Sequence, residues 1–477
     1  MAAGNAESVA NGVTGVRCMG SCDLFCRFEL SFVISKKLRV FNFANPHSGH
    51  SASLRSRLPF DDLKTCSQVF ANFSIFASLR EIVRLDTTES LLPEKNIMKT
   101  RVILTLTLIF AATIFQAAFA SDIETQRKEM LDRAVTFLRQ SQVDDGSFSA
   151  SPRSGIGPTG VVISGLLEAG VSPDDPMVAK GLAYMQKYVH DDGGVYTTGG
   201  MFGNYESCIA ISCFANANQM IKESQKLEKG PYDELLANAE KYVRGCQYTE
   251  EQGYSPDNVY YGGSGYGVAD NQNMRPDLSN THFLIETLKS LGAAEDDPAI
   301  QKAIIFVSRC QNLESEHNTE AFAAKNQDGG FIYHPNDGGN SPAGETPNGG
   351  LRSYGSMTYA GLKSMIYAGL DEDDIRVKAA HDWAKKHYDV EANPGLGQAG
   401  LYYYYQVLGK TLDALKIDVF QSDDGKEHPW RNDLLNALAA RQQENGSWVN
   451  ENSRWMENDP NLVTGYVLLV LAHCREN

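Results

Sequence analysis

Residues that could do chemistry gather where polar and aromatic side chains precede apolar segments of the chain. Aspartate and histidine can exchange protons with a substrate, and tyrosine rings attract cations through their quadrupole. We expect catalytic roles for Asp277, His282, Tyr354 and Tyr402. We expect substrate contacts from Tyr205, Glu206, Asn280, Thr358, Tyr403 and Trp448. The alternative interpretation is structural, with hydroxyls capping helices and aromatic rings filling a core.

One further set of side chains could hold a metal. Glu206, Cys208 and His282 offer a carboxylate, a thiolate and an imidazole, which are ligands of zinc. Cys208, however, lies alone in an apolar run, where a cysteine behaves as a small hydrophobic residue. The other four cysteines after Ala120 also lie beside apolar residues. We therefore expect buried thiols without a disulfide framework, no metal and no cofactor.

Two kinds of predicted helix alternate from residue 122 onward and must position these side chains. Amphipathic, charged helices are predicted at 123–142, 174–189, 231–247, 296–311, 372–388 and 430–443. Apolar helices with few charges are predicted at 158–170, 205–222, 278–292, 355–369, 397–412 and 461–475. A helix that is apolar all round is buried, whereas one with a charged face lies outside. Six inner and six outer helices in strict alternation indicate an all-α fold, an α/α toroid. An open solenoid is the alternative, but its end repeats would need polar caps.

The connections between these helices are of two kinds. Inner-to-outer turns are short and contain paired aspartates, at 174–175, 296–297 and 373–374, which can cap the following helix. Outer-to-inner connections are long, notably 248–277 and 312–354, and long loops in compact domains are usually functional. We therefore expect any pocket at the starts of the inner helices. Free N–H groups and helix dipoles there would favour an anionic group such as a diphosphate.

A glutamine, a glycine turn and an aromatic residue recur together at the ends of outer helices. The three copies are Gln142 to Phe148, Gln311 with Gln327 to Phe331, and the segment 434–448, which ends in Trp448. This pattern resembles the QW repeat of squalene cyclases and of protein prenyltransferase β subunits. The segments 279–281, 355–358 and 446–448 are similar to signatures of exported prenyltransferase/squalene-oxidase-repeat proteins of bacteria. The resemblance covers nearly all of 122–477 and implies an α/α toroid and, as in the characterised members of the family, isoprenoid substrates.

Two motifs of these families have partial counterparts in this chain. The segment Asp371-Glu372-Asp373-Asp374 resembles the D-x-D-D acid with which squalene–hopene-type cyclases protonate an alkene. Its position, however, matches that of the aspartate turns at 174–175 and 296–297, so we interpret it as a helix cap. Glu206, Cys208 and His282 resemble the zinc set of protein prenyltransferases, with glutamate in place of aspartate.

The N-terminal region has the features of an export signal. Lys99 and Arg101 precede an apolar run at 102–115, and Ala118 and Ala120 fit a signal-peptidase site. We interpret 98–120 as a signal peptide, 121–477 as the toroid and 1–97 as a wrongly assigned or disordered extension. The alternative is a cytoplasmic head followed by a signal anchor. We expect an exported protein, periplasmic or extracellular, whose mature chain starts at Ser121 and has no stable membrane span.

The net charge of the chain excludes one class of function, and the helix pattern favours another. A net charge of −16 argues against binding to a phosphate backbone. The preferred hypothesis is a squalene-cyclase- or prenyltransferase-like protein that acts on or binds an isoprenoid or another hydrophobic molecule. The alternatives are a non-catalytic toroid that binds lipid, glycan or protein, and a secreted glycan-active enzyme. The sequence does not indicate an oligomeric state.

Overall fold

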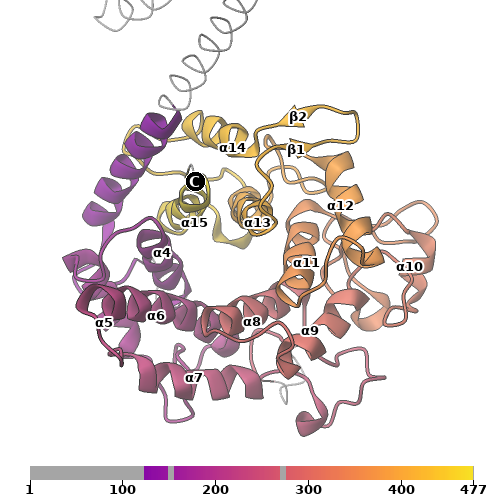
Figure 1. Ribbon diagram of the computed structural model, residues 1–477, viewed down its shortest axis with the longest axis horizontal. Helices are drawn as coiled ribbons and strands as arrows, with labels where there is room; N and C mark the ends of the chain where they lie inside the picture. Colours follow the sequence, from indigo (N-terminus) through magenta and orange to yellow (C-terminus); the bar gives the residue numbers. More distant parts are fainter. Residues whose placement is uncertain (1–122, 149–154, 269–274, 476–477) are drawn as a thin grey trace, which may run out of the picture. The chain divides into compact units, whose positions relative to one another are not determined.

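The structure is a computed structural model that describes residues 123–148, 155–268 and 275–475. Six helices form an inner ring: α4 (Gly157–Glu168), α6 (Gly203–Gln225), α8 (Leu278–Ser290), α11 (Gly355–Tyr367), α13 (Leu401–Ala414) and α15 (Pro460–His473). Six lie outside them: a helix over 123–141, α5 (Pro176–Gln186), α7 (Asp233–Gly245), α9 (Pro298–Arg309), α12 (Ile375–His387) and α14 (Trp430–Ala439). Figure 1 shows the two concentric rings. The predicted all-α toroid is therefore confirmed.

Burial explains which helices lie inside. The outer helix α7 buries three side chains, Leu236, Ala239 and Val243, which form a single apolar stripe. The inner helix α15 buries every residue from Asn461 to Leu471. Because a surface helix needs only one apolar face, this difference assigns α7 to the outer ring and α15 to the inner ring.

The inner ring is closed. Each inner helix packs on the next one in the chain, and α15 returns to α4. A Cβ atom added at Gly165 of α4 would lie 2.7 Å from the carbonyl oxygen of Gly465 on α15. One added at Gly465 would lie 3.1 Å from Cα of Val162. These two glycines therefore allow the close approach of the first and last inner helices. The open solenoid alternative is wrong.

One hydrogen-bond pattern joins neighbouring outer helices at four places. The side-chain amide of Gln142 donates to the carbonyl oxygens of Gly146 (3.0 Å) and Met177 (2.9 Å), the latter in the first turn of the next outer helix. Gln247, Gln311 and Gln442 each donate in the same way to one glycine and one residue of the next outer helix. Gln442 reaches Met130 in the helix over 123–141, which closes the outer ring. The sequence pattern missed Gln247 because Ser264 follows its glycine partner, Gly262, where the other copies have an aromatic residue.

The aspartates of the short turns cap helices, as predicted. Asp374 accepts a hydrogen bond from the backbone N–H of Arg376 at 2.9 Å, at the start of α12. Asp175 and Asp297 do the same at the starts of α5 and α9. The Arg376 guanidinium also donates to Asp374 and holds the pKa of this carboxyl below its usual value. The D-x-D-D segment is therefore a capping turn.

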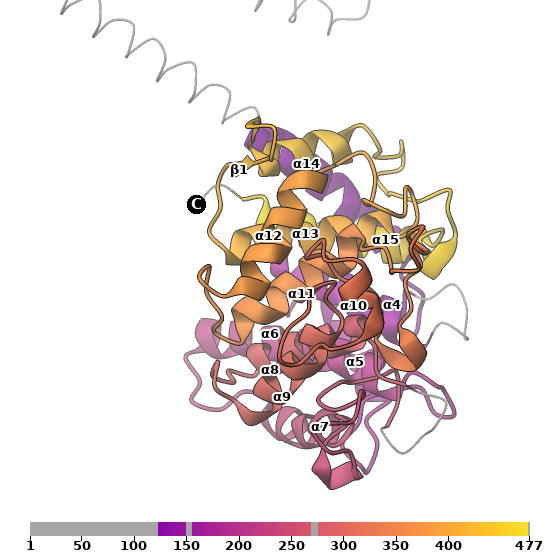
Figure 2. The same cartoon turned by 90° about the vertical axis from the view of Figure 1, so that its right-hand side faces the viewer.

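The long connections carry small elements of their own: η2 (Glu250–Gln252), α10 (Ala321–Lys325), η3 (Asn336–Gly338), the antiparallel pair β1 (Phe420–Gln421) and β2 (Glu427–His428), and η4 (Arg454–Met456). Figures 1 and 2 show α10 at the periphery, outside α11. The five described cysteines are free and buried, as predicted. No helix of the described ranges is long and apolar enough to cross a membrane. The predicted extension and signal peptide lie outside the described residues.

Candidate functional site: two chambers inside the toroid

Two chambers lie among the inner helices and the loops that precede them. The first has a volume of about 260 Å³ and lies at the starts of the inner helices, where the sequence predicts a pocket. Its walls are mainly aromatic: Phe202, Tyr205, Tyr266, Phe283, Tyr333, Tyr354, Tyr403, Trp455 and Tyr466. We call it the aromatic chamber. The second, of about 350 Å³, lies toward the C-terminal ends of the inner helices. Phe283 and Tyr466 line both chambers, so the two chambers adjoin at these rings.

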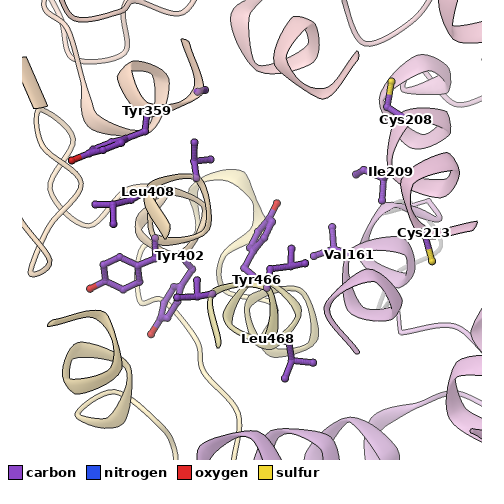
Figure 3. Packing of buried hydrophobic residues seen from close by; sticks show 14 of the residues in the cluster. Val161, Cys208, Ile209, Cys213, Tyr359, Tyr402, Leu408, Tyr466 and Leu468 are labelled. Carbon is purple, nitrogen blue, oxygen red and sulfur yellow. The ribbon is translucent and has the colours of Figure 1, made fainter. Parts of the chain in front are cut away.

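The rings of the aromatic chamber contact one another in a continuous series. The ring centroid of Tyr205 lies 5.4 Å from that of Phe283, Phe283 lies 6.3 Å from Tyr403, and Tyr403 lies 6.0 Å from Tyr466. Figure 3 shows the ring of Tyr466 directed into the space enclosed by the inner helices. Burial raises the pKa values of Tyr205 and Tyr403 above the usual range of tyrosine, so both hydroxyls stay protonated at neutral pH. The walls are therefore uncharged rings with electron-rich faces.

Two carboxylates line the aromatic chamber, and both serve the fold. Glu457 accepts hydrogen bonds from the N–H groups of Tyr402 (3.0 Å) and Tyr403 (2.9 Å) at the start of α13. Glu206 accepts from the N–H groups of Thr197 (2.7 Å) and Ile156 (3.2 Å). Burial raises the pKa of each carboxyl against these hydrogen bonds. The lining residues include no lysine, arginine or histidine.

The expected anion site at the helix starts is therefore wrong. At α8 the Asn280 N–H donates to Asp277, at α11 the Ser356 N–H donates to Asn393, and at α15 two N–H groups donate to Asp459. Together with Glu457, these acceptors already use the groups that a phosphate would need. A diphosphate here would also face two carboxylates without a cation.

Asp277 caps α8 directly behind the chamber wall. Its carboxylate accepts from the Asn280 N–H at 2.9 Å and from the Asn280 side-chain amide at 2.7 Å. Burial raises the pKa of Asp277 to about 6, although the hydrogen bonds from Asn280 and from the Tyr333 hydroxyl lower it. The hydroxyl oxygens of Tyr333 and Tyr266 lie 3.3 Å apart, and both rings line the chamber. Asp277 does not line the chamber itself but connects to it through these two tyrosines.

The other predicted site residues divide into two groups. Tyr354, Tyr205, Glu206 and Tyr403 line the aromatic chamber. His282, Tyr402, Asn280, Thr358 and Trp448 are buried and do not line it. Tyr402 packs edge-on against Tyr405 at 5.8 Å, and Figure 3 shows it directed away from the ring of Tyr466. Asn280 is held by Asp277.

Thr358 and Trp448 belong to a recurring structural contact. The Thr358 hydroxyl accepts from the Phe331 N–H at 3.1 Å, and the Thr464 hydroxyl accepts from the Trp448 N–H at 3.2 Å. Phe148 donates in the same way to Thr159. Threonine hydroxyls near the starts of the inner helices thus hold the aromatic residue after each glycine turn against the inner ring. This contact explains why the threonines recur at the starts of inner helices.

An ionic cluster lies at the second chamber, and we define it as Glu168, Glu286, Lys363 and Lys410. Lys363 is fully buried behind the lining, and the other three side chains are partly buried. Lys363 Nζ lies 2.8 Å from Glu286 Oε1, and Lys410 Nζ lies 3.0 Å from the same oxygen and 3.8 Å from Glu168 Oε1. Burial lowers the pKa of Lys363 to about 8. Although burial opposes it, Lys363 and Lys410 hold the pKa of Glu286 well below its usual value. The cluster therefore contains two carboxylates and two ammonium groups.

His282 belongs to this end of the ring. Its Nε2 lies 3.5 Å from Glu286 Oε2, and the side chain is fully buried. Burial, together with the nearby positive charges of Lys363 and Lys410, lowers the pKa of His282 to about 3, so the ring is neutral at physiological pH. Sequence reasoning missed the ionic cluster. Its signal is a single charged residue within an otherwise uncharged inner helix, as at Lys363 in α11 and Glu168 in α4.

The possible zinc ligands do not come together. Glu206 is occupied by backbone N–H groups, and His282 lies beside Glu286. Burial raises the pKa of Cys208, so its thiol stays protonated. In the described part of the chain, no three His, Cys, Asp or Glu side chains are grouped so that they could hold a metal ion.

No family model and no curated protein matches the chain. Among solved structures, the chain is similar to the type II terpene cyclase MstE from Scytonema. The ligand-free enzyme shares 11% identity, with 73% of this chain and 98% of that chain covered and a TM-score of 0.45. A variant in complex with the product merosterolic acid A has the same identity and TM-score, with 74% of this chain covered. A variant in complex with the substrate geranylgeranyl dihydroxybenzoate, also 11% identical, has a TM-score of 0.44. At this identity the similarity concerns the fold.

Proposed function

We propose that the aromatic chamber binds an isoprenoid or a similar apolar, unsaturated chain. The observation that supports this most strongly is the composition of the chamber wall, where nine aromatic side chains occur beside Met357, Leu462 and Pro158. Transfer of each methylene group from water into such a site contributes about 0.8 kcal/mol. Aromatic faces also attract the electron-poor edges of double bonds and any cation that forms along the chain.

The charges of the chamber agree with an apolar ligand. Its two carboxylates, Glu206 and Glu457, are occupied by backbone N–H groups and do not offer a free ion-pairing partner. The tyrosine hydroxyls are protonated. A ligand that fits this surface therefore has its apolar part here and any charged group elsewhere.

Turnover is the second candidate function, and Asp277 is the observation that favours it. A carboxyl group whose pKa is about 6 is partly protonated near neutral pH. The Tyr333 and Tyr266 hydroxyls could pass its proton into the chamber. The proton would add to one alkene carbon, and a second double bond would attack the resulting cation to give a cyclised cation. Loss of a proton from the cyclised cation, through the same tyrosines to the Asp277 carboxylate, would form the new double bond and return the acid to its starting state. In this scheme the atoms balance as an isomerisation.

Fluorescence titration of the full chain with farnesol tests the binding function. Trp455 lines the chamber and is 42% exposed, so its emission reports an occupied chamber. A Trp455→Phe variant identifies the contribution of this residue. Tyr403→Leu removes one aromatic face and should weaken binding roughly two- to tenfold, equivalent to about 0.5–1.5 kcal/mol.

The matched control is Tyr404→Leu, on the same helix. The Tyr404 side chain is buried, and its hydroxyl donates to the Asp389 carbonyl oxygen, away from the chamber lining. This variant should bind farnesol as the unchanged protein does, once circular dichroism shows that both variants are folded. Equal losses in the two variants would refute the chamber as the binding site.

Export from the cell is part of this proposal. The basic residues Lys99 and Arg101, the apolar run and the small residues Ala118 and Ala120 support it. N-terminal sequencing of the protein recovered outside the cytoplasm should find Ser121 as the first residue. Recovery of the chain in the cytoplasm with Met1 or Met98 at its N-terminus would contradict export.

A further inference from the structure

The second chamber has a different chemical character from the aromatic chamber. Beside Phe283, Tyr466 and aliphatic residues such as Val161, Ile209 and Leu469, it presents hydroxyl and amide side chains from several inner helices, among them Ser164, Ser212, Asn216 and Gln406. Hydroxyl and amide groups both donate and accept hydrogen bonds. We call this space the polar chamber. A mixture of this kind matches a ligand that is itself both donor and acceptor.

The charges around the polar chamber balance. Glu286 pairs with Lys363 and Lys410, and Glu168 lies 3.8 Å from Lys410 and 3.5 Å from His473 Nε2, which is also bonded to Asp413 through its Nδ1. An anionic ligand would compete with two carboxylates for Lys410, and a cationic ligand would meet Lys410 in the same place. The cluster therefore disfavours a ligand with a net charge. The same contacts keep the pKa values of Glu168 and Glu286 below their usual values, so neither carboxyl is a general acid for glycoside cleavage.

Gln406 supplies an independent indication of a ligand. Its side chain lines the polar chamber and is 95% buried, since only 5% of its surface is exposed. Among the described residues it has no hydrogen-bond partner. Its amide atoms are open to the chamber, where water or a ligand can donate to the oxygen and accept from the nitrogen. A ligand hydroxyl could satisfy both the oxygen and the nitrogen of this amide.

We propose that the polar chamber binds an uncharged, hydroxyl-rich group, such as a sugar. This group is the polar head of the molecule whose apolar chain occupies the aromatic chamber, so the inference rests on the proposed function. Phe283 and Tyr466 line both chambers, and a ligand that passes between them places its chain on one side and its head on the other. The substrate class is therefore a glycosylated isoprenoid.

A head-group series with one common chain tests this proposal. The full chain is titrated by calorimetry with geraniol, geranyl β-glucoside, geranyl phosphate and geranylamine, and Trp455 emission is followed in parallel. The glucoside should bind at least about tenfold more tightly than geraniol, equivalent to about 1.4 kcal/mol. The phosphate and the amine should bind no more tightly than geraniol.

Gln406→Leu locates the head group. This variant should remove the advantage of the glucoside while its affinity for geraniol stays unchanged, which also shows that the variant is folded. Gln421→Leu, at an exposed position of β1, is the matched control and should retain the advantage.

The possible outcomes separate the two proposals. Equal affinities for geraniol and the glucoside would overturn the head-group assignment. The polar chamber would then hold only water, and the proposal that the aromatic chamber binds the chain would stand. Tightest binding of the phosphate or the amine would overturn it in favour of a charged head. If geraniol binds without changing Trp455 emission, or does not bind, the proposed function itself fails.

Discussion

Lys363 on α11 and Glu286 on α8 form a salt bridge of 2.8 Å inside the toroid, where the Lys363 side chain is fully buried. Loss of one partner of a buried pair leaves a charge without compensation and typically costs about 3–5 kcal/mol. We expect this loss in the unfolding free energy of Glu286→Gln, because the fully buried Lys363 would lose its 2.8 Å carboxylate partner and Lys410 would keep only Glu168, at 3.8 Å. Urea denaturation measures it.

Lys363→Met provides the matched comparison for Glu286→Gln. In this variant Glu286 keeps Lys410 as a partner at 3.0 Å, so the loss should be smaller. A loss of unfolding free energy below about 1 kcal/mol in both variants would mean that Lys363 and Glu286 behave as a solvent-exposed salt bridge and that water reaches the cluster.

The burial of Asp277 predicts a pH dependence of stability. Its pKa is about 6 in the folded protein, against a usual value of 3.8, so the folded state holds more protons between these two values. The stabilisation is complete below about pH 4 and is lost as pH rises through about 6. A difference of about two pKa units corresponds to about 3 kcal/mol.

Asp277→Asn tests this pH dependence, because asparagine also caps helices and does not titrate. The unfolding free energy of the unchanged protein, relative to that of the variant, should fall by about 3 kcal/mol from pH 4 to pH 7. Urea denaturation at a series of pH values gives both curves. Curves that stay parallel would show that Asp277 keeps its usual pKa.

The outer ring is closed by Gln442, whose amide donates to the carbonyl oxygens of Met130 and Gly446, both at 3.0 Å. Gln442→Leu removes both hydrogen bonds and should cost about 1–3 kcal/mol in unfolding free energy. The neighbour Gln443 is exposed and its amide makes one contact of 3.4 Å. Gln443→Leu should therefore stay within about 0.5 kcal/mol of the unchanged protein. Similar effects of the two substitutions would contradict the role of Gln442 in closure.

The fold could be predicted from the sequence because it depends on local pattern. Helices such as α15, apolar on every side, can lie only inside, and helices such as α7, with one apolar stripe, lie outside. The aspartate turns were predicted for the same reason, since Asp374 caps a helix within two residues of itself.

The site could be predicted only in part because it depends on which face of an inner helix points inward. Tyr402 and Tyr403 are neighbours in sequence, yet only Tyr403 lines the aromatic chamber. Likewise, an isolated lysine in the apolar helix α11 gives no indication that its partner is Glu286, 77 residues earlier in the chain. Such contacts follow from the three-dimensional arrangement of helices distant in sequence.

A structure of the full chain with bound farnesol tests the proposed binding site most directly. We predict that the isoprenoid chain lies in the aromatic chamber, in contact with Tyr205, Phe283 and Tyr403, whose rings form its wall. The Met357→Trp variant, which places a larger ring at a lining position, should show no bound chain. Farnesol bound on the outer surface of the toroid, or bound equally in the Met357→Trp variant, would contradict the proposed function.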